Sequence, residues 1–494
     1  MTLTNVQSLR YFVPETVLSL AIVALLVVDM LAGGRRRGLN AAVACAGLLA
    51  AFVAALLQVG TEPVALFEGM LVLDPFGIFF KLFFIAVTLV VVLIVHPYGE
   101  LSQRYHGESY AMMLGTVIGM CLLATANNLL MMYLALEMTS LPSYLLTSVL
   151  RRDTKSSEAG LKYVLFGAAA SGAMVYGMSL FYGMTGTLAL GELRQALLAG
   201  GVPTGPLLVA TVFVLAGFGF KMSMVPFHSW TPDVYEGAST PVTAFFSVGP
   251  KAAGIAVLLR FFASGLATTQ DGVRVPFAGL DWPFLLSLLS AVTMTLGNLA
   301  ALRQNNVKRM LAYSSIAHAG YMLMGAVLLT DSGFQAIIFY LVVYGLMNLG
   351  AFLVVIAYSA ETRREDFEHY RGLGWRRPLL AVPMAFFMFS LTGIPPFAGF
   401  VGKVYLFKAV IERDLYWLAF VGILNSVVSL YYYMRIVKTM YLDDPGEAPA
   451  EPVRVPRLHT ALILLLAVPT LVFGFRFGLL DRLSSYSLRI FTGS

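Results

Sequence analysis

Long apolar stretches separated by short polar segments run through the chain from Tyr11 nearly to its C-terminus. A helix needs about 20 consecutive apolar residues to cross the hydrocarbon core of a membrane. Lipid offers no hydrogen-bond partner to an open backbone, and the stretches are too long for barrel strands, so each is predicted to be a helix. The pattern predicts an all-α integral membrane protein with about 14 spans, near residues 12–31, 39–59, 75–96, 109–126, 128–150, 159–183, 205–228, 241–263, 282–302, 307–330, 334–358, 380–409, 416–440 and 458–480.

Two of the predicted spans are interrupted. Residues 215–226 read LAGFGFKMSMVP and residues 391–403 read LTGIPPFAGFVGK, so each stretch combines glycine, proline and one lysine. Proline removes a backbone donor and glycine loosens a helix, so both helices are predicted to open near mid-membrane. Interruptions of this kind in two halves of a chain indicate a repeat transporter with a central ion path.

The composition agrees with a membrane protein. Hydrophobic residues make up 58% of the chain and charged residues 12%, whereas a soluble protein carries about a quarter charged residues. The two cysteines, Cys45 and Cys121, both lie in apolar segments. Because an iron–sulfur cluster takes about four cysteine ligands, the pair is interpreted as small hydrophobic residues.

The basic residues of the loops test the number of spans. With 14 spans, most of the loop lysines and arginines fall on one side of the membrane, and the positive-inside rule then predicts that both termini lie on the outer face. The net charge of +6 therefore indicates orientation and not nucleic-acid binding. The residues concerned are Arg35, Arg36, Arg37, Arg151, Arg152, Lys155, Arg303, Lys308, Arg309, Arg363, Arg364, Arg371, Arg376, Arg377, Arg435, Lys438, Arg454 and Arg457.

Several ionisable residues lie within the apolar spans. A charge at the bilayer centre costs about 2.5–3.5 kcal/mol even on the most favourable scale, so a set of them indicates function. Burial disfavours the charged form of an amine, and a nearby carboxylate favours it, so small rearrangements can load or release a proton. The residue types fit a proton relay through Glu137, Lys162, Lys221, His228, Lys251 and Lys403.

Each of these residues also has a structural interpretation. The lysines could snorkel or form fixed ion pairs, and Glu137 could merely neutralise one of them. For Lys162 and His228 the residues alone leave functional and interfacial roles equally open. For His318 the interpretation as a residue that hydrogen-bonds a neighbour is slightly favoured over a place in the relay. Three further cations close to predicted span ends are interpreted as snorkelling side chains: Lys81, Arg260 and Lys408.

Motifs for cofactor binding are missing from the sequence. There is no G-x-x-x-x-G-K-[ST] phosphate loop, no G-x-G-x-x-G after a strand and no metal-ligand spacing. We therefore expect the chain to bind no nucleotide, flavin, iron–sulfur cluster or metal. The energy for ion movement must then come from another protein.

Four runs of sequence resemble the antiporter-like subunits of respiratory complex I, the proton-translocating NADH–quinone oxidoreductase. They are KMSMVPFHSWTPDVYEGA at 221–238, NVKRMLAYSSIAHAGY at 306–321, IPPFAGFVGK at 394–403 and EMTSLP at 137–142. The wording TPDVYEG, the run after Glu137 and Lys403 are most similar to the N-subunit branch of that family. The resemblance covers nearly the whole chain.

The resemblance implies a fold and a set of roles. It implies two inverted five-helix repeats, spans 4–8 and 9–13, with broken helices at spans 7 and 12. The segments are then 1–108 (three helices), 109–263 and 282–440 (the repeats) and 441–494 (the last helix and tail). The family's relay positions fall on Glu137, Lys162, Lys221, His228, Lys251 and Lys403, with Glu137 and Lys221 as a charge pair.

The resemblance also implies partners and a location. NADH, FMN, iron–sulfur clusters and quinone are expected in partner subunits, and the chain would contact a neighbouring antiporter-like subunit and small membrane subunits in a bacterial inner membrane. Two other functions stay open: a subunit of a multi-subunit Na⁺(K⁺)/H⁺ antiporter, and an enzyme with its own redox or quinone chemistry. The wording of spans 7 and 12 counts against the former, and the missing cofactor motifs count against the latter.

Overall fold

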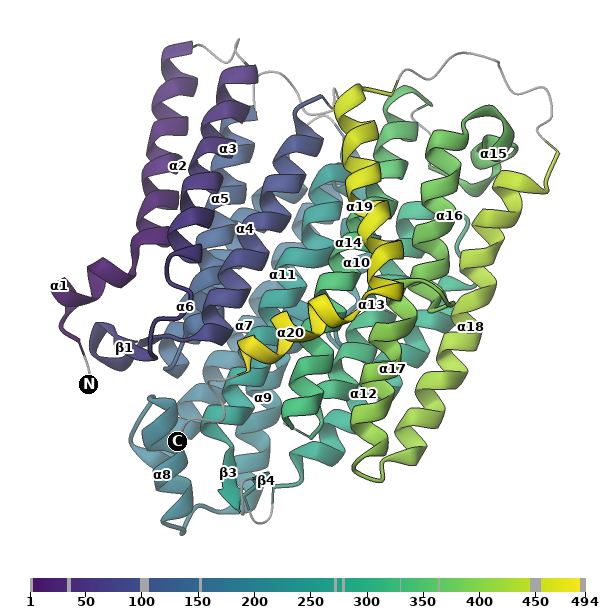
Figure 1. Cartoon of the computed structure of the whole chain (residues 1–494). Coiled ribbons are helices and arrows are strands. Elements are labelled where there is room, and N and C mark those ends of the chain that lie inside the picture. Colours follow the sequence, from purple (N-terminus) through teal and green to yellow (C-terminus); the bar gives the residue numbers. More distant parts are fainter. Residues whose placement is uncertain are drawn as a thin grey trace.

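The computed structural model describes residues 3–32, 37–97, 106–150, 153–270, 273–277, 280–328, 330–362, 365–444 and 455–488. Within these residues the chain is an almost wholly helical bundle (Figure 1). Seven arginines of the predicted basic loops lie outside the described residues: Arg35, Arg36, Arg151, Arg152, Arg363, Arg364 and Arg454. The orientation of the termini therefore stays a prediction.

The helices account for most of the described chain. They are α1 (Asn5–Ser8), α2 (Val13–Ala32), α3 (Arg37–Leu56), α4 (Pro75–Val95), α5 (His106–Thr125), α6 (Leu129–Thr147), α7 (Thr154–Thr185), α8 (Leu190–Leu198), α9 (Thr204–Met222), α10 (Trp230–Gly237), α11 (Thr240–Arg260), α12 (Trp282–Ala301), α13 (Val307–Ala326), α14 (Asp331–Thr362), α15 (Leu373–Arg376), α16 (Pro378–Thr392), α17 (Ala398–Ile411), α18 (Tyr416–Tyr441), α19 (Arg457–Phe475) and α20 (Gly478–Ser487).

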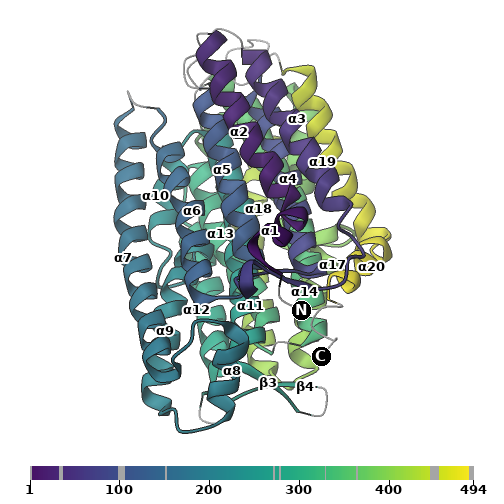
Figure 2. The same cartoon turned by 90° about the vertical axis from the view of Figure 1, so that its left-hand side faces the viewer.

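Two short antiparallel hairpins join helices. The first pairs β1 (Val64–Leu66) with β2 (Leu71–Leu73), and the second pairs β3 (Ala267–Gln270) with β4 (Val273–Pro276). The second hairpin lies beside α8 at one end of the bundle, and α15 lies at the opposite end (Figure 1). Helix α20 runs obliquely across the outside of the bundle instead of along it (Figures 1 and 2).

The predicted membrane fold is confirmed, but the number of 14 spans is not. Among the described residues, 12 helices are long and apolar enough to cross a membrane. Two of the predicted ranges do not meet this criterion. Helix α13 carries Lys308, Arg309 and His318, which make it more polar, and the range 380–409 is divided into α16 and α17.

Both predicted helix breaks are present. Helix α9 ends at Met222 because Ser223 adopts a left-handed conformation with φ of 63°, and helix resumes only at α10. Helix α16 ends in the same way at Thr392, because the next residue, Gly393, has a φ of 87°. Glycine adopts this conformation without strain. The prolines in the two gaps supply no backbone donor that would continue either helix. The interruption therefore leaves carbonyl groups free in the interior of the bundle.

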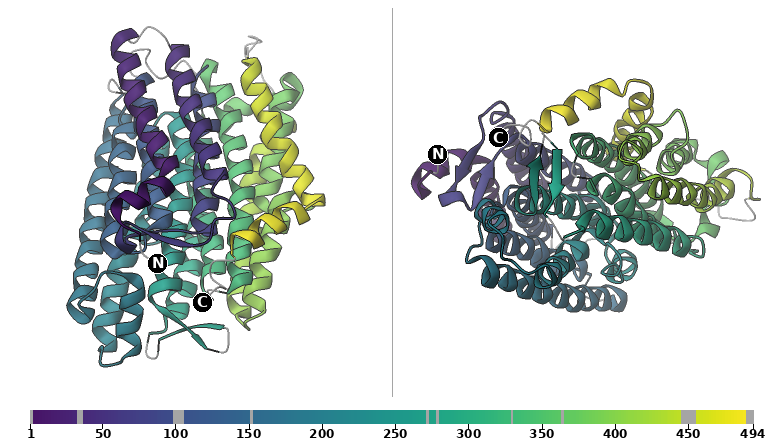
Figure 3. Two further views of the ribbon diagram at one scale, coloured as in Figure 1. Left: turned by 60° about the vertical axis from the view of Figure 1, so that its left-hand side comes forward. Right: turned by 90° about the horizontal axis from the view of Figure 1, so that it is seen from below.

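Helices α11 and α14 form the centre of the bundle. Every residue of α11 is buried, and α11 packs against α4, α5, α9, α13 and α14. Helix α14 contacts α16, α17 and α19 on its other side. The view from below shows the helices of the two halves of the chain next to each other (Figure 3). Any ionisable group on α11 is consequently shielded from lipid on all sides.

Two cations interpreted from the sequence as snorkelling are instead buried in ion pairs. The Nζ atom of Lys81 on α4 lies 2.7 Å from the Oε1 atom of Glu15 on α2. Arg260, at the end of α11, donates two hydrogen bonds to Asp74, at 2.8 and 2.9 Å, and a third to a backbone carbonyl. The snorkelling interpretation was wrong for both, because each partner carboxylate comes from a distant part of the sequence. Lys408 is exposed, in agreement with the prediction.

Replacing Asp74 with alanine is expected to destabilise the bundle. The change leaves the Arg260 guanidinium buried without its counter-charge, which costs about 3–5 kcal/mol. The matched control is Lys408→Ala, because its ion pair with Glu412 is exposed and contributes about 0.3–0.5 kcal/mol. The midpoint of thermal unfolding of the purified protein measures both effects. Equal midpoints for the two variants would contradict this role of the buried pair.

Candidate functional site

Three lysine amines are buried in the described interior without a direct ion pair. Lys221, Lys251 and Lys403 have exposed fractions of 0%, 1% and 3%. Among the described residues, none of them takes part in an ion pair. A buried charge without a partner is unfavourable, so these amines are the most unusual electrostatic feature of the interior.

The first amine lies at the broken helix α9. Lys221 occupies its last turn and donates a hydrogen bond of 3.0 Å to the Ser140 hydroxyl of α6. Glu137 lies one turn before Ser140 on α6, close enough for its charge to act on Lys221. Among the described residues no ion pair within 4 Å joins Glu137 to Lys221, so the expected charge pair stays a prediction. The Glu137 Oε1 atom is buried and has no hydrogen-bond partner.

The second amine lies at the centre of the bundle. Lys251 of α11 donates a hydrogen bond of 2.5 Å to the Ser315 hydroxyl of α13. Ser315 accepts a second hydrogen bond, of 2.9 Å, from the Tyr344 hydroxyl of α14. The amine also lies 5.5 Å from the centre of the Tyr235 ring. Hydroxyl groups and an aromatic face therefore surround the Lys251 amine.

The third amine lies at the second helix break. Lys403 of α17 donates a hydrogen bond of 2.8 Å to the carbonyl of Thr392, the last residue of α16, and one of 3.2 Å to the Ser426 hydroxyl. The last carbonyls of a helix have no partner within the helix and carry its negative partial charge. The break thus provides an acceptor that suits a cation. The Tyr321 ring lies 4.6 Å from the amine on another side.

His318 and tyrosine hydroxyls occupy the space between the second and third amines. The His318 ring contacts the Tyr340 hydroxyl through Nδ1 at 2.8 Å and the Tyr433 hydroxyl through Nε2 at 3.0 Å. The Tyr433 hydroxyl also hydrogen-bonds Ser314. The hydrogen bond to a neighbour that we favoured for His318 is thus present. Rings of Tyr344 and Tyr321 lie on either side of it, at 5.1 and 5.9 Å.

Of the polar groups that connect the amines, His318 was considered for the relay and the others were not predicted. Four of these groups share one face of α13, where Ser314, Ser315, His318 and Tyr321 recur at intervals of one or three residues. That spacing was a usable signal in the sequence. The tyrosines of α14 and α18 gave no such signal, because a tyrosine in an apolar helix is usually a packing residue.

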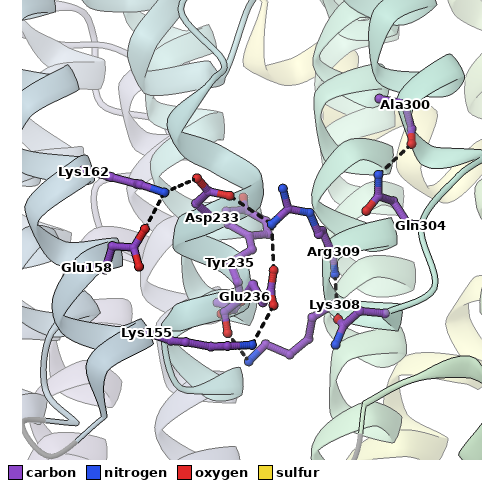
Figure 4. Close-up of polar contacts among 12 residues, drawn as sticks. Lys155, Glu158, Lys162, Asp233, Tyr235, Glu236, Ala300, Gln304, Lys308 and Arg309 are labelled. Atoms are coloured by element: carbon purple, nitrogen blue, oxygen red, sulfur yellow. Dashed lines mark hydrogen bonds and ion pairs between the residues drawn. The ribbon is translucent and has the colours of Figure 1, made fainter.

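Lys162 and His228 differ from the three buried amines. Lys162 is 37% exposed and forms ion pairs of 2.8 Å with both Glu158 and Asp233 (Figure 4). His228 is half-buried in the gap between α9 and α10, close enough to Lys251 for their charges to interact. The structure therefore does not place Lys162 with the other lysines. Asp233, its partner on α10, and Arg309, which also pairs with Asp233, were not predicted as site residues, although Asp233 lies in the TPDVYEG motif.

A family model described as "NADH:quinone oxidoreductase/Mrp antiporter, TM" matches residues 126–429, a range that contains all the predicted relay residues. NADH-quinone oxidoreductase subunit N of Anaeromyxobacter sp. (strain Fw109-5) is 46% identical over 99% of this chain and 98% of its own length. Subunit N 2 of Sorangium cellulosum (strain So ce56) is 48% identical over 97% of this chain and 96% of its own. The chain belongs to the NADH-quinone oxidoreductase subunit N family.

Solved structures agree with membership of the subunit N family. A chain of respiratory complex I from Thermus thermophilus with bound aureothin superposes with a TM-score of 0.79 at 34% identity, covering 96% of this chain and 99% of that one. A chain of the Mrp complex from Dietzia sp. DQ12-45-1b has a TM-score of 0.82 at 23% identity, covering 98% of each chain. At that identity the second likeness reflects the shared fold. The comparisons favour the oxidoreductase over the cation antiporter.

As a member of the subunit N family, the chain is a membrane subunit of NADH-quinone oxidoreductase. Among the described residues, no group of three or more His, Cys, Asp or Glu side chains is arranged to hold a metal ion. The chemically distinctive groups of the described interior are instead the amines, His318 and the hydroxyls around them.

Replacing Tyr433 with phenylalanine is expected to destabilise the centre of the bundle without changing its packing. The change removes the hydroxyl that His318 and Ser314 share, and leaving buried polar groups unpaired costs about 1–3 kcal/mol. Tyr431→Phe is the matched control, because that ring is on the same helix but 64% exposed. The thermal unfolding midpoint of the purified complex checks the difference. A midpoint for Tyr433→Phe as high as that of the control would argue against a structural part for this hydroxyl.

Proposed function

We propose that the chain is a non-redox subunit that translocates protons, driven by electron transfer in partner subunits of the complex. The observation that carries this proposal is the set of three buried amines that form no direct ion pair among the described residues, Lys221, Lys251 and Lys403. Burial alone disfavours the charged form of an amine. Such groups can exchange a proton when a nearby charge or hydrogen bond changes.

The hydrogen bonds support a sequence of proton carriers across the bundle. Glu137 and Lys221 would form the first site, together with Ser140, which accepts a hydrogen bond from Lys221. Lys251 would receive the proton next, with the help of His228 and of the hydroxyls of Ser315 and Tyr344. Hydroxyls and imidazoles both donate and accept hydrogen bonds, so they can pass a proton without holding a charge permanently.

Lys403 would control the last part of the path. Its amine is held by the Thr392 carbonyl, which is free only because helix α16 ends there. His318 and Tyr321 lie between Lys251 and Lys403 and would connect the two. Lys162 would act beside this path, at the edge of the bundle, where it pairs with Asp233. The six residues predicted from the sequence thus keep a place in the proposal, five of them as proton carriers.

The arrangement of the chain supports two related halves. Helices α9 and α10 are separated by a break next to Lys221, and α16 and α17 by a break next to Lys403. We assign the segments 109–263 and 282–440 to two inverted repeats, with 1–108 and 441–494 outside them. Both termini would lie on the outer face of a bacterial inner membrane. Neighbouring antiporter-like and small membrane subunits would cover the sides of the bundle, and NADH, FMN, iron–sulfur clusters and quinone would belong to partner subunits.

Replacing Lys221 with alanine tests the proposal. In the assembled complex the change should strongly reduce both proton pumping and the coupled reduction of quinone by NADH, because the first amine of the path is lost. Lys408→Ala is the matched control, since it removes an exposed lysine that makes only a surface ion pair. Reconstituted vesicles with a pH-sensitive dye measure pumping, and NADH absorbance measures turnover.

Two results would count against the proposal. Pumping and turnover at the wild-type level in Lys221→Ala would show that this amine carries no protons. Pumping that requires Na⁺ or K⁺ in the vesicles would indicate the cation-antiporter function instead.

A further inference from the structure

A cluster of charged side chains surrounds the short helix α10, the second half of the first broken helix. Helix α10 has eight residues and lies between His228 in the break and helix α11, which carries Lys251. Two turns of helix have little stability of their own, so tertiary contacts must hold α10 in place. Figure 4 shows these contacts between α7, α10 and α13.

Two carboxylates of α10 each bind cations on both neighbouring helices. Asp233 accepts from Lys162 of α7 at 2.8 Å and from Arg309 of α13 at 2.9 Å. Glu236 accepts from Lys155 of α7 at 3.1 Å and from Arg309 at 2.7 Å. The ion pairs therefore bridge α7 and α13 through α10.

The end of α10 is held by a further lysine of α13. Lys308 donates hydrogen bonds of 3.2 and 3.0 Å to the backbone carbonyls of Glu236 and Ala238, and it forms an ion pair of 3.1 Å with Glu365. A cation at the free carbonyls of a helix end is favourable. Helix α10 is thus bound at its side chains and at its backbone by the same helix.

The start of α10 has its own, mostly apolar, anchor. Trp230 stacks on Tyr163 of α7 with 4.3 Å between the ring centres, and its Nε1 atom donates to the Phe220 carbonyl of α9. The ion pairs therefore determine chiefly where the far end of α10 lies, and with it the first turn of α11.

The charges in the cluster balance. Three cations and three carboxylates line a cavity of about 190 Å³, and they are Lys155, Glu158, Lys162, Asp233, Glu236 and Arg309. The ion pair between Lys308 and Glu365 completes the cluster, which then holds four cations and four carboxylates. With no excess of either sign, the cluster is not suited to binding a free ion. Lys162 has two carboxylates at 2.8 Å, which favour its charged form, so it is a poor proton donor.

We propose that this cluster is a clamp that positions the second half of the broken helix, and that Lys162 and Asp233 are positioning residues of the clamp and not carriers of protons. The inference deepens the proposed function and rests on it, since the purpose of the clamp is to keep His228 and Lys251 in register. Arg309 suits the role of a permanent anchor because a guanidinium does not lose its proton in proteins.

Substitutions of Lys162 and Asp233 distinguish a positioning role from the transfer of protons. Lys162→Arg keeps the charge but cannot release a proton, so a clamp predicts pumping near the wild-type level, whereas a proton carrier predicts its loss. Asp233→Asn removes the charge that joins α7 to α13, and it should lower pumping and raise hydrogen exchange of the α10 amides several-fold in the assembled complex. Asp233→Glu should restore both readouts in large part.

Glu158→Gln is the matched control for the clamp. Glu158 belongs to the same cluster, but among the described residues its ion pair is with Lys162 on its own helix α7, and it forms no ion pair with α10. Its loss should leave the exchange of the α10 amides unchanged. Hydrogen exchange is followed by mass spectrometry on the complex, with proton pumping measured on the same preparations.

The outcomes distinguish this inference from the proposed function. Unchanged exchange at α10 in Asp233→Asn would overturn the clamp, whatever the pumping rate. Loss of pumping in Lys162→Arg with normal exchange would overturn it as well, because Lys162 would then carry protons. Faster hydrogen exchange of α10 with unimpaired pumping in Asp233→Asn would show that pumping does not need the clamp. That result would overturn the proposal that the clamp serves proton translocation. Hydrogen exchange reports on α10 whether or not protons move, so full pumping in Lys221→Ala would refute the proposed function alone.

Discussion

A lysine amine among apolar helices keeps its hydrogen bonds only if hydroxyls or free carbonyls lie beside it. This constraint explains why the two helix breaks, the polar face of α13 and the central tyrosines occur together. The break after α16 frees the Thr392 carbonyl for Lys403, and α13 turns Ser315 toward Lys251. Each acceptor is neutral, so it accepts a hydrogen bond from the amine without fixing the charge of the amine through an ion pair.

The sequence predicted the fold well because its signals are local. Apolar length located the helices, and glycine and proline beside Lys221 and Lys403 located both breaks. The same reasoning failed for Lys81 and Arg260, which lie close to helix ends but are buried in ion pairs. The hydropathy pattern indicates where a residue lies along its helix. It does not indicate which distant carboxylate the fold brings next to that residue.

The candidate site was predictable in its charged members and not in the groups between them. A lysine in an apolar helix is rare enough to indicate function by itself. A tyrosine or serine in the same helix is common, and only the packing of α14 and α18 against α13 shows that Tyr344 and Tyr433 face Ser315 and His318. The connection depends on tertiary contacts, which no local pattern contains.

Lysines of one chain thus fall into two electrostatic classes that residue type alone cannot separate. Lys162 lies at the edge of the bundle with carboxylates from two helices, and its charge is fixed by them. Lys251 lies on the fully buried helix α11, where its amine contacts the Ser315 hydroxyl and faces the Tyr235 ring. A group whose charge is fixed can hold parts of the protein in place, whereas a group whose charge is not compensated can respond to its surroundings. Because α10 also carries Tyr235, whose ring lies 5.5 Å from the Lys251 amine, a displacement of α10 would alter the surroundings of Lys251 directly.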